Sequence, residues 1–190
     1  MTLATMTRHE WGMIMAIPTI RDATLADAEA LAALKLFTFH QTFIAGYAIP
    51  YPPDDLALFE AETYSVAQIT AELMDATHQT WVAEQGGALV GYVHCGPCKL
   101  PHADVGDGDR ELYQLYLTND AQGFGLGRQL LDLAVRWMKQ GTGAAMWIGV
   151  WSGNDRARAI YAARGFAEVG EYQFKVGDWR DDEFVLHKAL

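Results

Sequence analysis

The stretch from Glu111 to Met138 constrains the fold most, because it combines a strand, a glycine-rich turn and a helix without a break. Glu111 to Leu117 is an almost unbroken apolar run with tyrosines and leucines, which is typical of a strand buried on both faces of a sheet. From Leu126 onward, apolar residues recur at the spacing of one buried helical stripe. This order of elements predicts a core strand that leads directly into an amphipathic helix.

The turn between the strand and the helix reads QGFGLG at residues 122–127, with glycine at every second position. Such a turn lets the backbone approach a ligand closely and directs several N–H groups to one point at a helix N-terminus, where the dipole also favours an anion. It therefore predicts a cradle for a phosphate or pyrophosphate. A dinucleotide fingerprint would need a glycine at Arg128 or Leu130, and a P-loop would need Lys and then Ser or Thr after the last glycine.

The rest of the chain alternates strands and helices with short connections. A Gly86–Gly87 turn predicts a hairpin, and Asn154 is a good N-cap. A short helix or turn is expected after Asp54. The other expected strands are 17–23, 80–84, 88–95, 144–151, 166–176 and 183–188. The other expected helices are 28–40, with residues 24–27 as its capping residues, 65–74 and 155–164. This order indicates one α/β (α+β) domain over residues 16–190 with a mixed sheet.

Length and charge limit the function. With 190 residues, 51% of them hydrophobic, the chain can bury one core but is short for two domains. The net charge of −10 argues against nucleic acid and an anionic membrane as partners. Most acidic side chains precede residue 121, which favours this part as the place for a cationic acceptor if the second part holds an anionic coenzyme. Acidic surfaces also serve solubility.

The sequence of the N-terminal segment predicts that this segment does not insert into a membrane. Residues 1–15 read as a loose N-terminal arm, and the apolar run before Pro18 is too short for a signal peptide or a membrane span. We therefore expect a soluble, cytoplasmic protein.

A second pattern follows the expected strand at 144–151 and supports a family resemblance. Its residues are Asn154, Ala157, Tyr161, Gly165 and Phe166. Together with Gln122-x-x-Gly125-x-Gly127, this pattern resembles the GNAT superfamily of N-acetyltransferases over residues 17–188. The short stretches 148–151 and 174–178 more narrowly resemble its bacterial polyamine N-acetyltransferase branch.

The resemblance implies a fold and a co-substrate. The GNAT fold has a mixed, mostly antiparallel central sheet of about seven strands, flanked by about four helices and splayed at the central strand, where the arm of acetyl-CoA fits. The N–H of Leu117 would then polarise the thioester carbonyl. The implied acetyl-CoA-binding residues are Tyr116, Leu117, Thr118, Gln122, Gly123, Phe124, Gly125, Leu126, Gly127, Arg128, Asn154 and Ala157. Arg156, Arg158 or Arg164 is expected near the nucleotide phosphates.

The resemblance also implies direct acetyl transfer to a primary amine without a covalent enzyme intermediate. Tyr161 is the expected general acid for the leaving thiolate, with a core tyrosine as the alternative interpretation. Glu111 is the first candidate for the proton acceptor, followed by Tyr113 and His94. A polyamine is the favoured acceptor, and an amino acid, an aminoglycoside or a protein N-terminus are alternatives. The exposed late strands are compatible with a homodimer.

One motif indicates a different function. Cys95-Gly96-Pro97-Cys98 has the spacing of a redox dithiol, but Pro101 and nearby glycines replace the helix that lowers the thiol pKa in such proteins. With His94 and His102 the cysteines could bind zinc, although adjacent residues of a strand point to opposite faces. We expect two reduced cysteines and no metal. A dithiol protein and a non-catalytic acyl-CoA-binding module are the alternatives from other classes.

Overall fold

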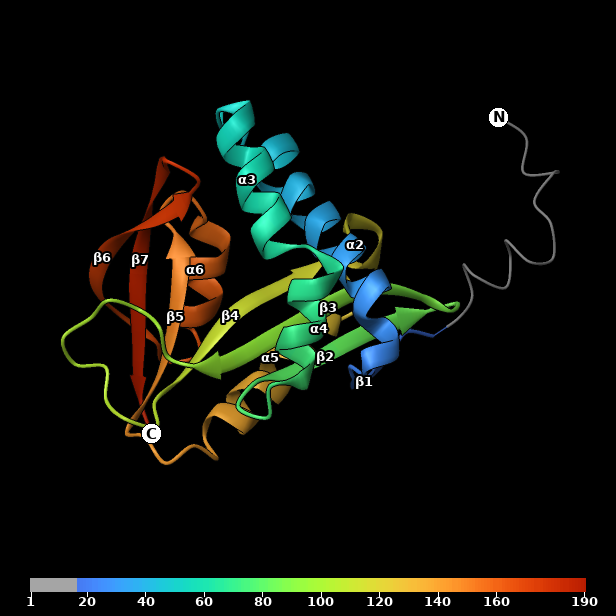
Figure 1. The fold of residues 1–190 in the computed structure, drawn as a ribbon. Coiled ribbons are helices and arrows are strands. Elements are labelled where there is room, and N and C mark those ends of the chain that lie inside the picture. The colour runs from blue at the N-terminus through green and yellow to red at the C-terminus, as the bar shows by residue number, and fades with distance from the viewer. Residues whose placement is uncertain (1–16) are drawn as a thin grey trace, which may run out of the picture.

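The computed structural model describes residues 17–190, and the expected N-terminal arm at residues 1–15 lies outside this range. Seven strands form one sheet in the order β1-β2-β3-β4-β5-β7-β6. Within this sheet β4 and β5 are parallel, and the other neighbouring strands are antiparallel (Figure 1). The prediction of a mixed, mostly antiparallel sheet of about seven strands is confirmed.

The elements follow the predicted order. The strands are β1 (Thr19–Asp22), β2 (Gln79–Gln85), β3 (Ala88–Pro97), β4 (Arg110–Leu117), β5 (Ala145–Trp151), β6 (Ala167–Val176) and β7 (Trp179–Ala189). The α-helices are α2 (Ala28–Phe39), α3 (Pro53–Thr63), α4 (Val66–Met74), α5 (Leu126–Met138) and α6 (Asp155–Ala162). No helix in this part of the chain is long and apolar enough to cross a membrane.

Two helical layers cover the sheet. Alternate residues of β2 and β3 point to opposite faces, so Val82 and Tyr92 pack with α2, whereas Ala83 and Val93 pack with α5. Helix α6 joins the α5 side through Tyr161. Helix α3 lies on the α2 side (Figure 1). There, aromatic side chains form a separate cluster that includes Val176 of β6. The sheet therefore has an α5/α6 face and an α2/α3 face.

The two parallel strands separate soon after they meet. β4 pairs with β5 only over Arg110–Leu112, opposite Met146–Ile148, although both strands continue further. A register shift between His94 and Cys95 of β3 leaves Tyr113 as an extra residue of β4 at the same level. This bulge bends the strand. The residues of β4 after Leu112 therefore border a gap, as the expected splay at the central strand requires.

The closed end of this gap is held by Asp109. Its Oδ1 accepts hydrogen bonds from the N–H groups of Ala144 at 2.8 Å and Ala145 at 3.0 Å, and its Oδ2 accepts one from Trp147 Nε1 at 2.8 Å. Burial opposes ionisation, but these bonds and the N–H of Gly106 hold the pKa of Asp109 below its ordinary value. The side chain thereby fixes the start of β5 beside the start of β4.

The open end is held by a π-helical segment. After α2 the chain continues as a π-helix over His40–Gly46, beyond the expected end of the first helix near His40. Gln41 on this segment donates to the carbonyl of Leu117 at 3.1 Å and accepts from the N–H of Asn119 at 3.0 Å. These bonds tie the segment to the end of β4, next to the glycine turn.

Two further elements are longer than predicted. α3 is a full helix because Pro53 starts it and two aspartates favour its first turn. β7 begins at Trp179, since Gly177 with φ +61° closes a tight hairpin with β6. Aspartates are rare in strands, which hid the first half of β7 from propensity alone.

Candidate active site

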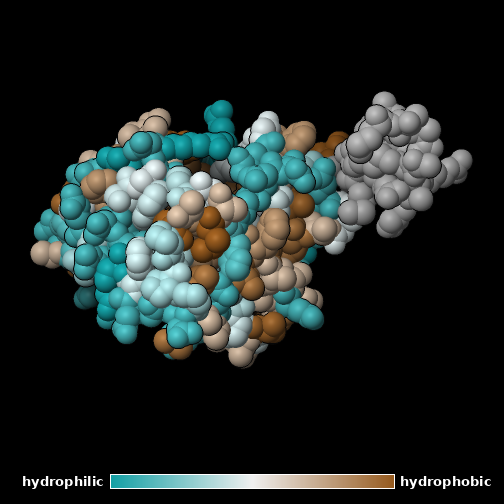
Figure 2. Space-filling model, turned by 90° about the horizontal axis from the view of Figure 1, so that it is seen from above, coloured by the Kyte–Doolittle hydropathy of each residue, from teal (hydrophilic) through white to brown (hydrophobic). Residues whose placement is uncertain are grey.

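Two cavities meet where β4 and β5 separate. The larger, of about 800 Å³, lies beside the glycine turn and α6. The smaller, of about 460 Å³, lies on the α2/α3 face. The side chains that line both are Leu115, Tyr116, Asn154, Ala157 and Tyr161. The space-filling view from above shows hydrophobic side chains near the middle of the visible surface, among hydrophilic ones (Figure 2). The site therefore has two chambers joined through the sheet.

The glycine turn has the geometry of an anion cradle. Gly123 and Gly125 have φ values of +90° and +77°, and a Cβ on either would meet nothing within 4 Å. Gly127 instead has its Cα against Leu117, where a Cβ would lie 3.3 Å from Cδ1. Gly125 is the N-cap of α5, and no side chain caps the helix there. The first N–H groups of α5 are thus open to the larger cavity.

The backbone of β4 presents alternate residues to the gap. The N–H of Thr118 donates to the carbonyl of Val90 at 2.9 Å, so its peptide faces β3. Successive peptide groups of a strand face opposite sides. Tyr116, opposite Tyr92, therefore also faces β3 through its backbone, while Leu117 faces the gap. The hydrogen bonds implied between β4 and the arm of acetyl-CoA can therefore be made by the backbone of Leu117 and, two residues earlier, that of Leu115.

Arginines surround the mouth of the larger cavity. Arg128, Arg156 and Arg164 line it, and Arg156 donates to Gln122 Oε1 at 3.1 Å. Arg158 lies elsewhere, because its guanidinium pairs with Asp155 and Glu168 and lies over a phenylalanine ring. Arg164 donates to Asp132 at 2.5 Å, so Arg128 and Arg156 are the two expected arginines that are best placed for an anion.

Tyr161 lies at the junction of the two cavities. It comes from α6, is 8% exposed, and packs edge-on against Phe166. Asn154, the N-cap of this helix, accepts the N–H of Ala157 at 3.0 Å and fixes where the helix starts. Among the described residues, no hydrogen bond of the Tyr161 hydroxyl is found, and burial raises its pKa to about 12. The phenol is therefore protonated and available as a donor.

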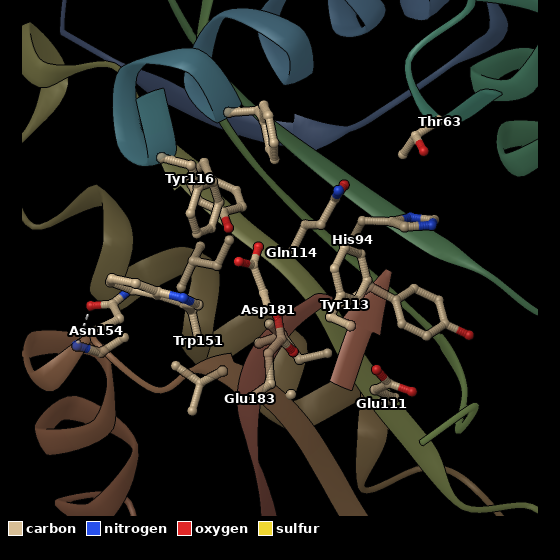
Figure 3. Close-up of a pocket in the computed structure, with 18 of the residues that line it drawn as sticks. Thr63, His94, Glu111, Tyr113, Gln114, Tyr116, Trp151, Asn154, Asp181 and Glu183 are labelled. Carbon is tan, nitrogen blue, oxygen red and sulfur yellow. Dashed lines mark hydrogen bonds between the residues drawn. The ribbon is translucent and has the colours of Figure 1, made fainter. Parts of the chain in front are cut away.

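Glu111 lies on the opposite face of the sheet, in the smaller cavity (Figure 3). It is 7% exposed, and its Oε2 accepts the N–H of Lys99 at 2.8 Å. Burial raises the pKa of Glu111 to about 7, and the nearby Glu183 contributes to this rise. A carboxyl with this pKa can accept or release a proton near neutral pH.

The two reserve candidates for proton acceptor are less suitable. The hydroxyl of Tyr113 donates to the carbonyl of Pro97, and burial raises its pKa. His94 is buried, and its Nδ1 lies 2.8 Å from Thr80 Oγ1. Burial and the nearby Lys35 lower the pKa of His94 well below its ordinary value.

Other carboxyl groups share this cavity, and sequence reasoning missed them. Asp181 and Glu183 extend into it from β7 (Figure 3). Asp181 accepts hydrogen bonds from Tyr51 Oη at 2.5 Å and from Trp179 Nε1 at 2.8 Å. Glu72, from α4, pairs with the buried Lys35 at 2.6 Å. An aromatic wall faces these groups and includes Phe39, Tyr51, Phe59, Tyr64, Trp151 and Phe174.

The cysteine motif lacks the helix start that lowers the thiol pKa in redox dithiols. Cys95 is buried within β3, and Cys98 follows the strand as a free thiol without a helix. Burial raises the pKa of both thiols, that of Cys98 to about 12, so both stay protonated at neutral pH. In residues 17–190 no group of three or more His, Cys, Asp or Glu side chains is placed to hold a metal ion.

Comparison with known proteins identifies the class. The sequence profile of the acetyltransferase (GNAT) family matches residues 37–166. An uncharacterized N-acetyltransferase in the pepI 3' region of Lactobacillus delbrueckii subsp. lactis is 28% identical over 79% of this chain and 87% of its own length. Another, from Mycobacterium bovis, is 28% identical over 87% of this chain and 99% of its own. The chain therefore belongs to the acetyltransferase (GNAT) family.

Solved structures agree with this assignment. A PaiA N-acetyltransferase from Thermoplasma acidophilum, in complex with coenzyme A, superposes with a TM-score of 0.68 at 19% identity, covering 92% of this chain and 99% of that one. A ribosomal-protein-alanine N-acetyltransferase from Brucella melitensis gives a TM-score of 0.60 at 25% identity, covering 90% and 99%. The fold is thus that of a GNAT acetyltransferase, and the chain is an enzyme of this class.

Proposed function

We propose that this enzyme transfers the acetyl group of acetyl-CoA directly to a primary amine, and that the amine is a polyamine. The meeting of the two cavities at Tyr161 is the observation that carries the proposal. A thioester entering from the anion-binding side and an amine entering from the acidic side come together at the gap between β4 and β5. The likeness to a coenzyme A complex supports this choice of acyl donor.

The larger cavity fits the phosphates and the arm of acetyl-CoA. The open helix start at Gly125 and the arginines around it suit a pyrophosphate. Gly123 and Gly125 hold left-handed backbone that other residues rarely adopt, and the space above them is free. The gap-facing peptides of Leu115 and Leu117 offer hydrogen bonds to an extended amide-bearing arm.

Three groups of the chain then serve the transfer. The N–H of Leu117 points to the gap, where it can stabilise negative charge on the thioester oxygen. Glu111 accepts a proton from the ammonium group, so that the amine nitrogen can attack the carbonyl carbon. Tyr161 donates its phenolic proton to sulfur as the carbon–sulfur bond breaks. The amide product loses its remaining extra proton, which restores the phenol.

The smaller cavity supports a cationic acceptor. Carboxyl groups from α4, β4 and β7 line it, and aromatic rings form the facing wall. Methylene chains pack on such rings, and further ammonium groups are attracted to their faces. Both features match a polyamine.

A protein N-terminus is the second candidate acceptor. The likeness to a ribosomal-protein-alanine N-acetyltransferase at 25% identity favours it. Amino acids and aminoglycosides are small cationic amines that also belong in the test.

The test is mass-spectrometric detection of acetylated product from acetyl-CoA and a panel of polyamines, amino acids, aminoglycosides and peptides near pH 8. Tyr161→Phe is assayed beside the native enzyme, and Tyr92→Phe is the control, because Tyr92 is fully buried and lines neither cavity. We expect spermidine or spermine to be acetylated and Tyr161→Phe to be slower by about 10²-fold. Acetylation of peptides alone would refute the polyamine, and no acetylated amine at all would refute the transfer.

A further inference from the structure

A glycine in β5 lets one carboxyl group of β7 reach the gap. Asp181 and Glu183 are two residues apart on β7 and therefore share the α2/α3 face. A Cβ on Gly149 would lie 3.0 Å from Glu183 Oε2 and 2.6 Å from the hydroxyl of Tyr172. Both side chains thus lie over β5, in the direction of β4, where any other residue at position 149 would obstruct them.

Hydrogen bonding distinguishes Glu183 from Asp181 and Glu72 of the same cavity, whereas Glu111, bonded through Oε2 to the N–H of Lys99, resembles it. Tyr172, its partner on β6, donates its hydroxyl to Oε2. Oε1 accepts no hydrogen bond from the residues that the structure describes. By contrast, both oxygens of Asp181 accept hydrogen bonds, and Glu72 is paired with Lys35. Glu183 is therefore held in place by one oxygen and keeps the other for a ligand.

A second polar group of this cavity also lacks a partner. Oε1 of Gln114 is buried and accepts no hydrogen bond within residues 17–190. Gln114 extends into the same cavity from β4 (Figure 3). A buried acceptor without a partner is unfavourable and is satisfied when a ligand brings an N–H donor. The unbonded oxygens of Glu183 and Gln114 can only accept hydrogen bonds, so both need a ligand that donates them. An ammonium group has three such N–H donors and no acceptor.

We propose that Glu183 binds the ammonium group of the acceptor amine at the gap, with Tyr172 as its positioning residue and Gly149 as the residue that makes room for both. This inference rests on the proposed function and deepens it. Glu183 then receives the amine as a cation beside Glu111, which takes its proton. The acceptor is accordingly an alkylammonium whose carbon chain follows the aromatic wall.

The electrostatics of the site are consistent with this role. Burial raises the pKa of Glu183 to about 7; Asp181 adds to the rise, and the hydroxyl of Tyr172 opposes it. Glu111 faces Glu183 from β4, and the ring of Tyr116 faces it from the same strand. A bound ammonium favours the ionised carboxyl, so amine binding releases a proton below neutral pH.

The test compares steady-state kinetics of Glu183→Gln and Asp182→Asn, with the amine that the native enzyme acetylates best on the panel. Asp182 is the matched control because it is the next residue of β7 and is exposed on the other face. For Glu183→Gln we expect the KM for the amine to rise at least about tenfold, as for loss of a hydrogen bond to a charged group. The KM for acetyl-CoA should stay within about twofold.

Tyr172→Phe keeps the proposal testable if Glu183→Gln does not fold. The hydroxyl of Tyr172 lowers the pKa of Glu183, so its removal should move the rise of kcat/KM for the amine to higher pH. A structural role alone would lower activity at every pH alike. An unchanged pH profile in Tyr172→Phe, or equal KM values for Glu183→Gln and Asp182→Asn, would overturn the inference.

These outcomes separate this inference from the proposed function. If the native enzyme acetylates an amine and Glu183→Gln behaves like the control, only the role of Glu183 is wrong. If the native enzyme acetylates no amine, the proposed function fails and the ammonium site fails with it.

Discussion

The buried carboxyl of Glu111 should make the enzyme less stable as the pH rises, and Glu111→Gln should remove that effect. Its pKa is raised from 4.5 to about 7 in the folded protein. A raised carboxyl pKa means that the folded state binds more protons than the unfolded state between these two values. Below pH 4.5 the group is protonated in both states and contributes nothing. Above pH 7 the folded state carries an unfavourable buried charge, which costs about 3 kcal/mol.

The comparison is made between pH 5 and pH 8. From the same two pKa values, the unfolding free energy of Glu111→Gln relative to the native enzyme should improve by roughly 2.5 kcal/mol over this range. The new amide can still accept the N–H of Lys99, and any cost of its buried NH₂ group is the same at both pH values. The difference between the two measurements therefore isolates the charge.

Urea unfolding followed by tryptophan fluorescence at each pH gives these free energies. Glu171→Gln is the control, because Glu171 is an exposed glutamate of β6. If the stability difference between Glu111→Gln and the native enzyme were the same at pH 5 and pH 8, Glu111 would not be a buried carboxyl of raised pKa. The suggestion that it accepts a proton near neutral pH would then lose its basis.

Other parts of the site give further predictions. Gly125→Ala should weaken acetyl-CoA binding about tenfold in calorimetry, because a side chain strains the left-handed turn; Gly87→Ala, also at positive φ with open space, should bind as the native enzyme does. Asp109→Asn should cost about 1–3 kcal/mol in urea unfolding at pH 7, since three donors from β5 and its entry lose a charged acceptor. Cys98→Ser should keep acetyl transfer within about twofold, and loss of activity there would revive the dithiol alternative.

The donor side of the site could be predicted from the sequence because its geometry is local. The glycine turn lies between a strand and a helix that are adjacent in the chain, so spacing alone fixes where the helix starts and what its N–H groups can bind. The same holds for Asn154 and Tyr161, seven residues apart on one short helix. For such motifs, the spacing of residues in the sequence already determines how close they lie in the structure.

The proposed acceptor side could be predicted only in part, because it depends on which distant strands become neighbours. β7 lies between β5 and β6 in the sheet, and this places Glu183 over Gly149. The acidic first part of the chain, favoured as the place for a cationic acceptor, contributes Glu72 and Glu111 to this cavity, whereas Asp181 and Glu183 come from the last strand. The π-helical turn at Gln41 likewise has no sequence pattern, because its reason is the contact with the end of β4.

The gap in the sheet separates the proposed proton donor from the proposed proton acceptor. Tyr161 reaches the gap from the α5/α6 face, whereas Glu111 and Glu183 reach it from the α2/α3 face. A phenol with a pKa of about 12 does not give its proton to a carboxylate with a pKa of about 7, so the two groups exchange no proton directly. Because β4 and β5 stop pairing after Leu112, the two groups face the same space with the strands between their backbones. Substrates that fill this space then connect them, so each proton transfer depends on the presence of the reacting atoms.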